Sequence, residues 1–157
     1  MTLSELLTPK AVTSNLRAKT KRDAIVELVD LLESAHGLKS QGEILDRVLR
    51  REAMMSTGIG NGVAIPHGKA KAADRMLAAC AISQEGVDFE SADGESAHIF
   101  ILLVSPEAVG ASHVKVLANI SRVLKEESVR KILREAGSAT ELLAALKAAE
   151  SQYLTTA

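Results

Sequence analysis

The sequence has few aromatic residues and a single cysteine. Phe, Trp and Tyr together make up 2% of the 157 residues, and tryptophan is absent. This scarcity argues against aromatic platforms that stack on bases or sugars, and against aromatic cages for quaternary cations. Cys80 is the only cysteine, which excludes an internal disulfide and a cysteine-based zinc knuckle. The residues left for chemistry are the four histidines, His36, His67, His98 and His113.

The chain also lacks net charge and a long hydrophobic run. Nineteen Lys and Arg residues against twenty Asp and Glu residues leave a formal net charge of -1. No global field therefore attracts nucleic acid or an anionic membrane. The longest apolar run outside the amphipathic segments, residues 99–104, is far shorter than the roughly 20 residues that span a bilayer, and the amino terminus has no basic region typical of a signal peptide. We expect a soluble, cytoplasmic protein with no nucleic-acid partner and no direct membrane insertion.

Length and composition are those of one globular domain. With 46% hydrophobic and 25% charged residues, a chain of 157 residues forms one full core and is too short for two ordinary domains. Residues 1–157 are therefore expected to form a single domain.

Two amphipathic helices are predicted in the first third of the chain. A capping box at residues 20–23 begins the first, whose apolar positions recur at helical spacing until Gly37. Residues 40–43 resemble a second capping box, which would begin a helix that ends near Met55.

The rest of the chain alternates between strand-like and helix-like segments. Residues 76–83 and 98–104 are predicted strands, the second buried on both faces, and residues 11–16 alternate weakly enough to suggest a third. Helices are predicted from Ser112 to about residue 124, then up to Gly137, and again after a capping box at residues 138–141. This order predicts an α/β (α+β) domain with helices packed on a small sheet.

Residues 56–69 contain four of the ten glycines and do not fit a nucleotide-binding loop. Val63 stands where a dinucleotide fingerprint needs its third glycine, and no strand precedes the segment. Gly68-Lys69 also fails as a phosphate loop, because Ala70 follows the lysine. The segment cannot be helical, since its glycines and Pro66 oppose a helix.

His67 follows Pro66 in this segment and precedes Gly68. The proline restrains Ile65 to an extended conformation, and the glycine places no side chain beside the imidazole. Such a histidine is poorly suited to filling a core, so we expect an exposed nucleophile, base or metal ligand. An ordinary histidine in a surface turn is the alternative.

His113 and Arg51 are the other candidates. His113 falls in the first turn of a predicted helix, near a cap at Ala111 or Ser112, where the helix dipole disfavours imidazolium. A neutral ring there can donate one hydrogen bond to a phosphoryl oxygen, although the position by itself favours a half-buried structural histidine at the start of an amphipathic face. Arg51 precedes the glycine-rich segment and could clamp a phosphoryl group with two hydrogen bonds, or be part of a solvated helix face.

The remaining histidines are predicted to be structural. His98 begins a buried strand, and His36 lies at a helix end, where a cation is mildly favoured. A metal site formed by His67, His98 and His113 is a rival use of these residues. It is disfavoured because no H-x-x-x-H pair is present and no carboxylate lies at ligand spacing beside His67.

The segment TGIGNGVAIPHG, residues 57–68, closely resembles the active-site signature of enzyme IIA of the fructose-mannitol class of the bacterial phosphoenolpyruvate-dependent phosphotransferase system. SHVKVLANISR, residues 112–122, is similar to that family's second histidine segment, and residues 50–52 to its arginine position. The resemblance covers nearly the whole chain. Because the sequence holds no membrane or enzyme IIB domain, it looks most like the free-standing nitrogen-regulatory branch.

This resemblance implies helices on both faces of a mixed sheet, and a site that needs no cofactor and no metal. His67 would accept a phosphoryl group, on the ring nitrogen Nε2, from a histidine phosphocarrier protein. His113 and Arg51 would stabilise the developing charge.

The resemblance also implies partners. The carrier would dock on an apolar ring around His67, for which Ile59, Val63 and Ile65 are candidates. The phosphorylation state would act as a regulatory signal, with targets such as potassium transporters or sensor kinases. Two alternatives stay open: a fructose- or mannitol-type transport subunit that passes the phosphoryl group to an enzyme IIB, and a non-catalytic interaction module.

Overall fold

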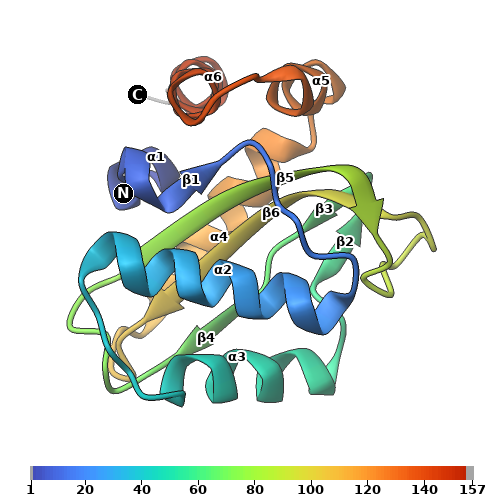
Figure 1. The fold of residues 1–157 in the computed structure, drawn as a ribbon. Helices are drawn as coiled ribbons and strands as arrows, with labels where there is room; N and C mark the ends of the chain where they lie inside the picture. The colour runs from blue at the N-terminus through green and yellow to red at the C-terminus, as the bar shows by residue number, and fades with distance from the viewer. Residues whose placement is uncertain (1, 155–157) are drawn as a thin grey trace.

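A mixed β-sheet forms the centre of the protein (Figure 1). The structure, a computed structural model, describes residues 2–154. The sheet has six strands, in the order β1-β5-β6-β3-β2, with β4 also paired to β6. The strands are β1 Val12–Thr13, β2 Gly58–Gly60, β3 Val63–Ala64, β4 His67–Lys69, β5 Leu77–Val87 and β6 Ala97–Ser105.

The longest apolar run of the sequence is the central strand, as predicted. Strand β6 is buried at every position but His98, because helices cover both faces of the sheet. Its edges are paired as well, antiparallel to β5 on one side and parallel to β3 and β4 on the other. Strand β5 extends beyond the predicted residues 76–83, to Val87, after a shift of register that follows Ile82. The weak strand predicted at residues 11–16 shortens to the two residues of β1.

Helices cover both faces of the sheet, which confirms the predicted fold class. In Figure 1, α2 and α3 lie across one face and α4 lies across the other, with α5 and α6 packed against α4. No helix within residues 2–154 is long and apolar enough to cross a membrane. The helices are α1 Leu3–Leu6, α2 Lys21–His36, α3 Glu43–Met54, α4 Ala111–Leu124, α5 Glu127–Glu135 and α6 Ala139–Tyr153, with a 3-10 turn at Pro9–Ala11.

Two of the three predicted capping boxes cap their helices. The side chains of Thr20 and Ser138 each accept a hydrogen bond from the backbone N–H three residues later. The prediction for α3 is wrong, because its N-cap is Gly42 in a left-handed conformation. Ser40 lies two residues before that N-cap, where its backbone N–H and hydroxyl donate to the Glu33 carboxylate of α2 and its hydroxyl oxygen accepts from the Ile44 N–H of α3.

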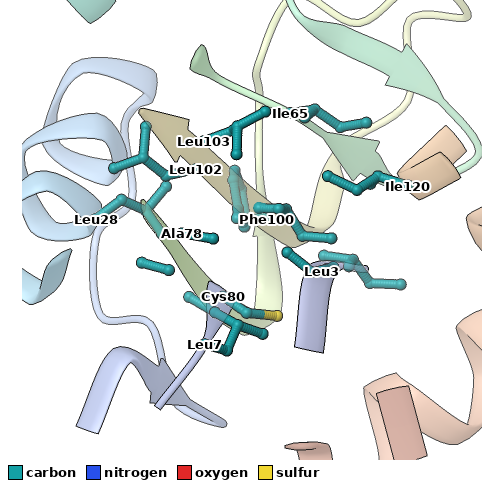
Figure 2. Close-up of a cluster of buried hydrophobic side chains, with 14 of the residues drawn as sticks. Leu3, Leu7, Leu28, Ile65, Ala78, Cys80, Phe100, Leu102, Leu103 and Ile120 are labelled. Atoms are coloured by element: carbon teal, nitrogen blue, oxygen red, sulfur yellow. The ribbon is translucent and has the colours of Figure 1, made fainter. Parts of the chain in front are cut away.

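The core packs from both sides onto β5 and β6 (Figure 2). Leu28 of α2 lies on one side of these strands, whereas Leu3 and Ile120 lie on the other. All three side chains are buried, and so is Phe100 of β6 between the two layers. The sheet is therefore held rigidly from both faces, which fixes the ends of β4 and β6 where the candidate site lies.

Candidate active site

His67 lies in a strand that is interrupted by a proline. Strands β3 and β4 pair with the same edge of β6 in one continuous register, Val63 opposite Ile99 and His67 opposite Leu103. Pro66 has no N–H to donate to β6, but its carbonyl still accepts from the Leu103 N–H, which keeps the two short strands in register on β6. The imidazole is therefore carried on a strand fixed to the centre of the sheet and not on the surface turn that the sequence left open as the alternative.

Gly68 allows α3 to approach β4 closely. A Cβ atom built on Gly68 would lie 3.3 Å from both the backbone nitrogen and Cγ2 of Val48 in α3. This contact is tighter than an ordinary van der Waals distance, so a side chain here would push the two elements apart. The glycine therefore places the end of α3, with its arginines, beside His67.

The protonation of the His67 ring follows from its hydrogen bond. Nδ1 lies 2.9 Å from the carbonyl oxygen of Ile65, which can only accept, so Nδ1 holds the proton and Nε2 has a free lone pair. Burial lowers the pKa of this half-buried ring below its usual range. The bond to Ile65 opposes that effect, and the charge of Arg51 adds to it. His67 is thus a neutral nucleophile with Nε2 available.

His113 is the second ring of the site. It lies in the first turn of α4, as predicted, although the N-cap is Gly110 and not Ala111 or Ser112. The two rings are 5.4 Å apart between centroids and inclined by 55°. Burial, the neighbouring His67 and the charge of Lys69 lower the pKa of His113 to about 4. The structure thus brings the two predicted histidines together and keeps the second one neutral.

Arg51 lies near His67, while its guanidinium is bonded elsewhere. Its Nη1 donates to the carbonyl of Met55, just beyond the end of α3, at 2.9 Å. Arg51 and both histidines share a hollow of about 360 Å³. The full lining of this hollow is Arg47, Arg50, Arg51, Met54, His67, Gly68, Lys69 and His113.

Glu52 of α3 binds the start of the glycine-rich segment, a role that was not predicted from the sequence. The buried carboxylate accepts from the N–H and hydroxyl of Thr57 and forms an ion pair with Lys21 at 2.9 Å. Because a buried carboxylate is costly without partners, this network fixes how the chain leaves the helix. Thr57 begins the family-like signature, but nothing in the sequence pairs it with Glu52.

The predicted apolar ring around His67 is partly wrong. Val63 and Ile65 are 1% and 4% exposed, because both belong to the core, where Figure 2 shows Ile65 beside Leu103. Ile59 is exposed, at 45%. Two methionines at the end of α3, Met54 and Met55, are 80% and 72% exposed and were not among the predicted residues. The sequence signal for them is a pair of adjacent methionines directly after the charged residues 50–52 of the predicted helix.

The other two histidines lie away from this site. His98 Nδ1 bonds the carbonyl of Ser83, and His36 Nε2 bonds that of Ala78. Both contacts fit the structural roles predicted for them. His67 pairs with Leu103, five residues along β6 from His98, or roughly 16 Å at about 3.3 Å per residue. One metal ion therefore cannot bind His67, His98 and His113 together.

Comparisons with known proteins agree with this fold. The family model described as "Phosphoenolpyruvate-dependent sugar phosphotransferase system, EIIA 2" matches residues 5–149. A nitrogen regulatory protein from Bradyrhizobium diazoefficiens is 33% identical over 93% of this chain and 95% of its own length. A fructose-specific EIIABC component from Bacillus subtilis is 37% identical over 88% of this chain, which spans only 22% of that longer protein.

A solved structure extends the similarity to three dimensions. The crystal structure of the nitrogen regulatory protein IIA-Ntr from Neisseria meningitidis superposes with a TM-score of 0.83, at 27% identity, over 91% of this chain and 97% of that one. The fold is therefore that of an enzyme IIA component of a phosphotransferase system. More specifically, the chain belongs to the EIIA 2 family of the phosphoenolpyruvate-dependent sugar phosphotransferase system.

Proposed function

We propose that this protein is a regulatory phosphoryl carrier of a nitrogen-type phosphotransferase system, which accepts a phosphoryl group on His67 from a histidine phosphocarrier protein. The observation that supports this role best is the hydrogen bond from His67 Nδ1 to Ile65, which leaves the Nε2 lone pair free. The ring is neutral and lies in a hollow lined by three arginines and a lysine. Family membership makes the phosphotransferase role the expected use of that lone pair.

The proposed step needs positioning and charge stabilisation but no external base. His67 Nε2 forms a bond to phosphorus while the phosphorus–nitrogen bond to the carrier's histidine breaks, and that electron pair returns to the carrier's ring. The proton of His67 stays on Nδ1, which donates it in a hydrogen bond to the Ile65 carbonyl. Because the transferred group is loosely bound to both nitrogens, the protein contributes mainly by aligning the rings and stabilising negative charge.

His113 and Arg51 are proposed to stabilise the equatorial oxygens. His113 is close to His67 and neutral. It can therefore donate one hydrogen bond to the phosphoryl group and carries no positive charge that would repel the histidine ring of the carrier. Arg51 uses Nη1 on Met55, which leaves its other N–H groups for a phosphoryl group in the shared hollow. Exposed Met54, which lines this hollow, and exposed Met55, which follows it in the chain, supply apolar contact for the carrier.

The regulatory role is supported by similarity to free-standing nitrogen regulatory proteins. A phosphoryl group adds roughly -1.5 to -2 charge by analogy with other phosphorylated residues. Added among Arg47, Arg50, Arg51 and Lys69, that charge would alter the surface potential around the hollow and so the choice of partner. Potassium transporters and sensor kinases are the classes of target that we propose.

Transport is the second candidate function. The fructose-specific relative from Bacillus subtilis, which is 37% identical, favours a role in passing the phosphoryl group to an enzyme IIB and then to sugar. The chemistry at His67 would be the same in both roles. They differ only in the acceptor that removes the phosphoryl group.

Labelling with purified components tests the proposal. The protein, incubated with phosphoenolpyruvate, enzyme I and the carrier, should gain one acid-labile phosphoryl group, detected by intact-mass and peptide mass spectrometry. His67→Ala should gain none, and the matched control His36→Gln should be labelled as the wild type is, because His36 lies outside the hollow. Labelling of His67→Ala would contradict the assignment, and an unlabelled wild type would favour the non-catalytic module.

The same assay separates the supporting roles. Arg51→Ala should slow transfer on the order of 100-fold, as removal of one charge-stabilising donor does elsewhere, while the thermal midpoint changes little. Arg134→Ala, an exposed arginine of α5, is the control. An unchanged rate for Arg51→Ala would reduce that residue to a surface charge. Addition of a fructose-type enzyme IIB tests the transport role, which predicts loss of the label from His67.

A further inference from the structure

Ser105 is a fully buried serine that the function above does not use. It is the last residue of β6 and is paired with Lys69 of β4, while Leu103 is paired with His67. Since side chains alternate along a strand, Ser105 lies on the same face of the sheet as His67. Its hydroxyl lies 2.5 Å from Nδ1 of His113, in a side chain–side chain contact that is wholly buried. Ser105 is thus the direct neighbour of the second histidine.

The direction of this hydrogen bond follows from what else is available to the serine. Within the part of the chain that the structure describes, His113 is the only hydrogen-bond partner of the Ser105 hydroxyl. If the ring donated from Nδ1, the hydroxyl proton would be buried without an acceptor, which is costly. If the serine donates, Nδ1 accepts and every proton of the pair is satisfied. The neutral ring then holds its own proton on Nε2.

We propose that Ser105 is a positioning residue, which holds His113 in the Nε2–H tautomer and presents that N–H to the phosphoryl group on His67. The inference rests on the proposed function of His67. Because Ser105 occupies Nδ1, Nε2 is the ring nitrogen left for the hollow that the two histidines share. His67 has its proton on Nδ1 and His113 has its proton on Nε2, so one ring offers a lone pair and the other a donor.

Loss of the serine should therefore damage transfer through His113. Without it, His113 can adopt the Nδ1–H tautomer. The lone pair on His113 Nε2 would then face the phosphoryl oxygens and repel them. Loss of an outer hydrogen-bond partner of a functional histidine commonly costs 10-fold to 100-fold in activity at metal sites. We expect Ser105→Ala to slow single-turnover transfer from the phosphorylated carrier about 10-fold.

Three variants test this. Ser105→Thr keeps a hydroxyl and should restore most of the rate that Ser105→Ala loses. Ser83→Ala removes another buried serine of the sheet, whose hydroxyl accepts from the Gly86 N–H, and should leave the rate unchanged. In a His113→Ala background, Ser105→Ala should have no further effect, because the serine acts through the ring. Full additivity of the two substitutions would overturn the proposal.

A spectroscopic measurement tests the tautomer directly. Two-bond ¹H–¹⁵N correlation spectra of the full-length wild-type protein should show the His113 proton on Nε2, and Ser105→Ala should show the Nδ1–H form. A wild-type proton on Nδ1 would overturn the proposal even if Ser105→Ala failed to fold. So would a wild-type rate for a folded Ser105→Ala. If the wild type is not labelled on His67, the proposed function fails, while the spectrum still decides which tautomer Ser105 selects.

Discussion

The chemistry of single residues here depends on which ring nitrogen holds a proton. His67 and His113 are both neutral, yet they bond to groups of opposite character, a backbone carbonyl and a serine hydroxyl. The first partner could be anticipated in part, because Pro66 and Gly68 frame His67 in the sequence. The second could not, since Ser105 is a residue of the apolar strand and meets His113 only after the chain turns into α4.

The low pKa of His113 predicts a dependence of stability on pH. The unfolded ring binds a proton near its ordinary value of 6.5, whereas the folded ring does so only at about pH 4. The unfolded state therefore binds more protons between these values, so stability from this group is present above pH 6.5 and is lost as the pH falls toward 4. Such a shift corresponds to about 3 kcal/mol at 1.36 kcal/mol per unit.

Urea unfolding of the wild type and His113→Gln at several pH values measures this effect. The glutamine variant cannot titrate at this position, so the difference between the two proteins reports the titration of His113 together with its interaction with His67. We expect the free energy of unfolding of the wild type to fall by about 3 kcal/mol relative to the variant between pH 6.5 and pH 4. A difference that is constant with pH would show that burial does not hold the ring neutral.

Among the elements, β4 and α3 decide the shape of the site. Helical periodicity and capping residues located the long helices within a few residues, because those features are local in sequence. The short strands β2, β3 and β4 could not be predicted, since each has two or three residues and exists through pairing with a partner. The start of α3 was misplaced because Gly42, in a left-handed conformation, is its N-cap, two residues after the serine expected to cap it.

The close contact between β4 and α3 predicts the effect of a single methyl group. Gly68→Ala would place Cβ 3.3 Å from the backbone of Val48, and a backbone atom cannot move without the helix. We expect a loss of about 1 to 3 kcal/mol in the free energy of unfolding, typical of overpacking. Transfer to His67 should also slow, because Arg51 moves away with α3.

Gly137→Ala is the matched control for this substitution. Its Cβ would meet only the end of the Glu141 side chain, at 3.6 Å, which is an ordinary contact. Calorimetric midpoints and single-turnover rates of both variants should show a defect for Gly68→Ala alone. Equal behaviour of the two variants would mean that α3 can shift without consequence for the site.

For the whole molecule, the surface around His67 is less ordinary than the composition suggests. The net charge is -1, but four cationic side chains line one hollow, beside exposed Met54. The sequence predicted the fold class because periodicity and burial are averaged over many residues. It misjudged the docking surface because alternation in a short parallel strand does not reveal that both faces are covered, as they are for Val63 and Ile65.

The central claim is that His67 accepts a phosphoryl group through Nε2, while its proton stays on Nδ1 and is donated in a hydrogen bond to the Ile65 carbonyl. The most direct test is ³¹P and ¹⁵N NMR of the protein after phosphorylation by phosphoenolpyruvate, enzyme I and the carrier, with histidine labelled with ¹⁵N. We predict a single phosphohistidine signal in which phosphorus couples to Nε2 of His67 and the proton stays on Nδ1. Phosphorus on Nδ1 of His67, or on any other residue, would contradict the account.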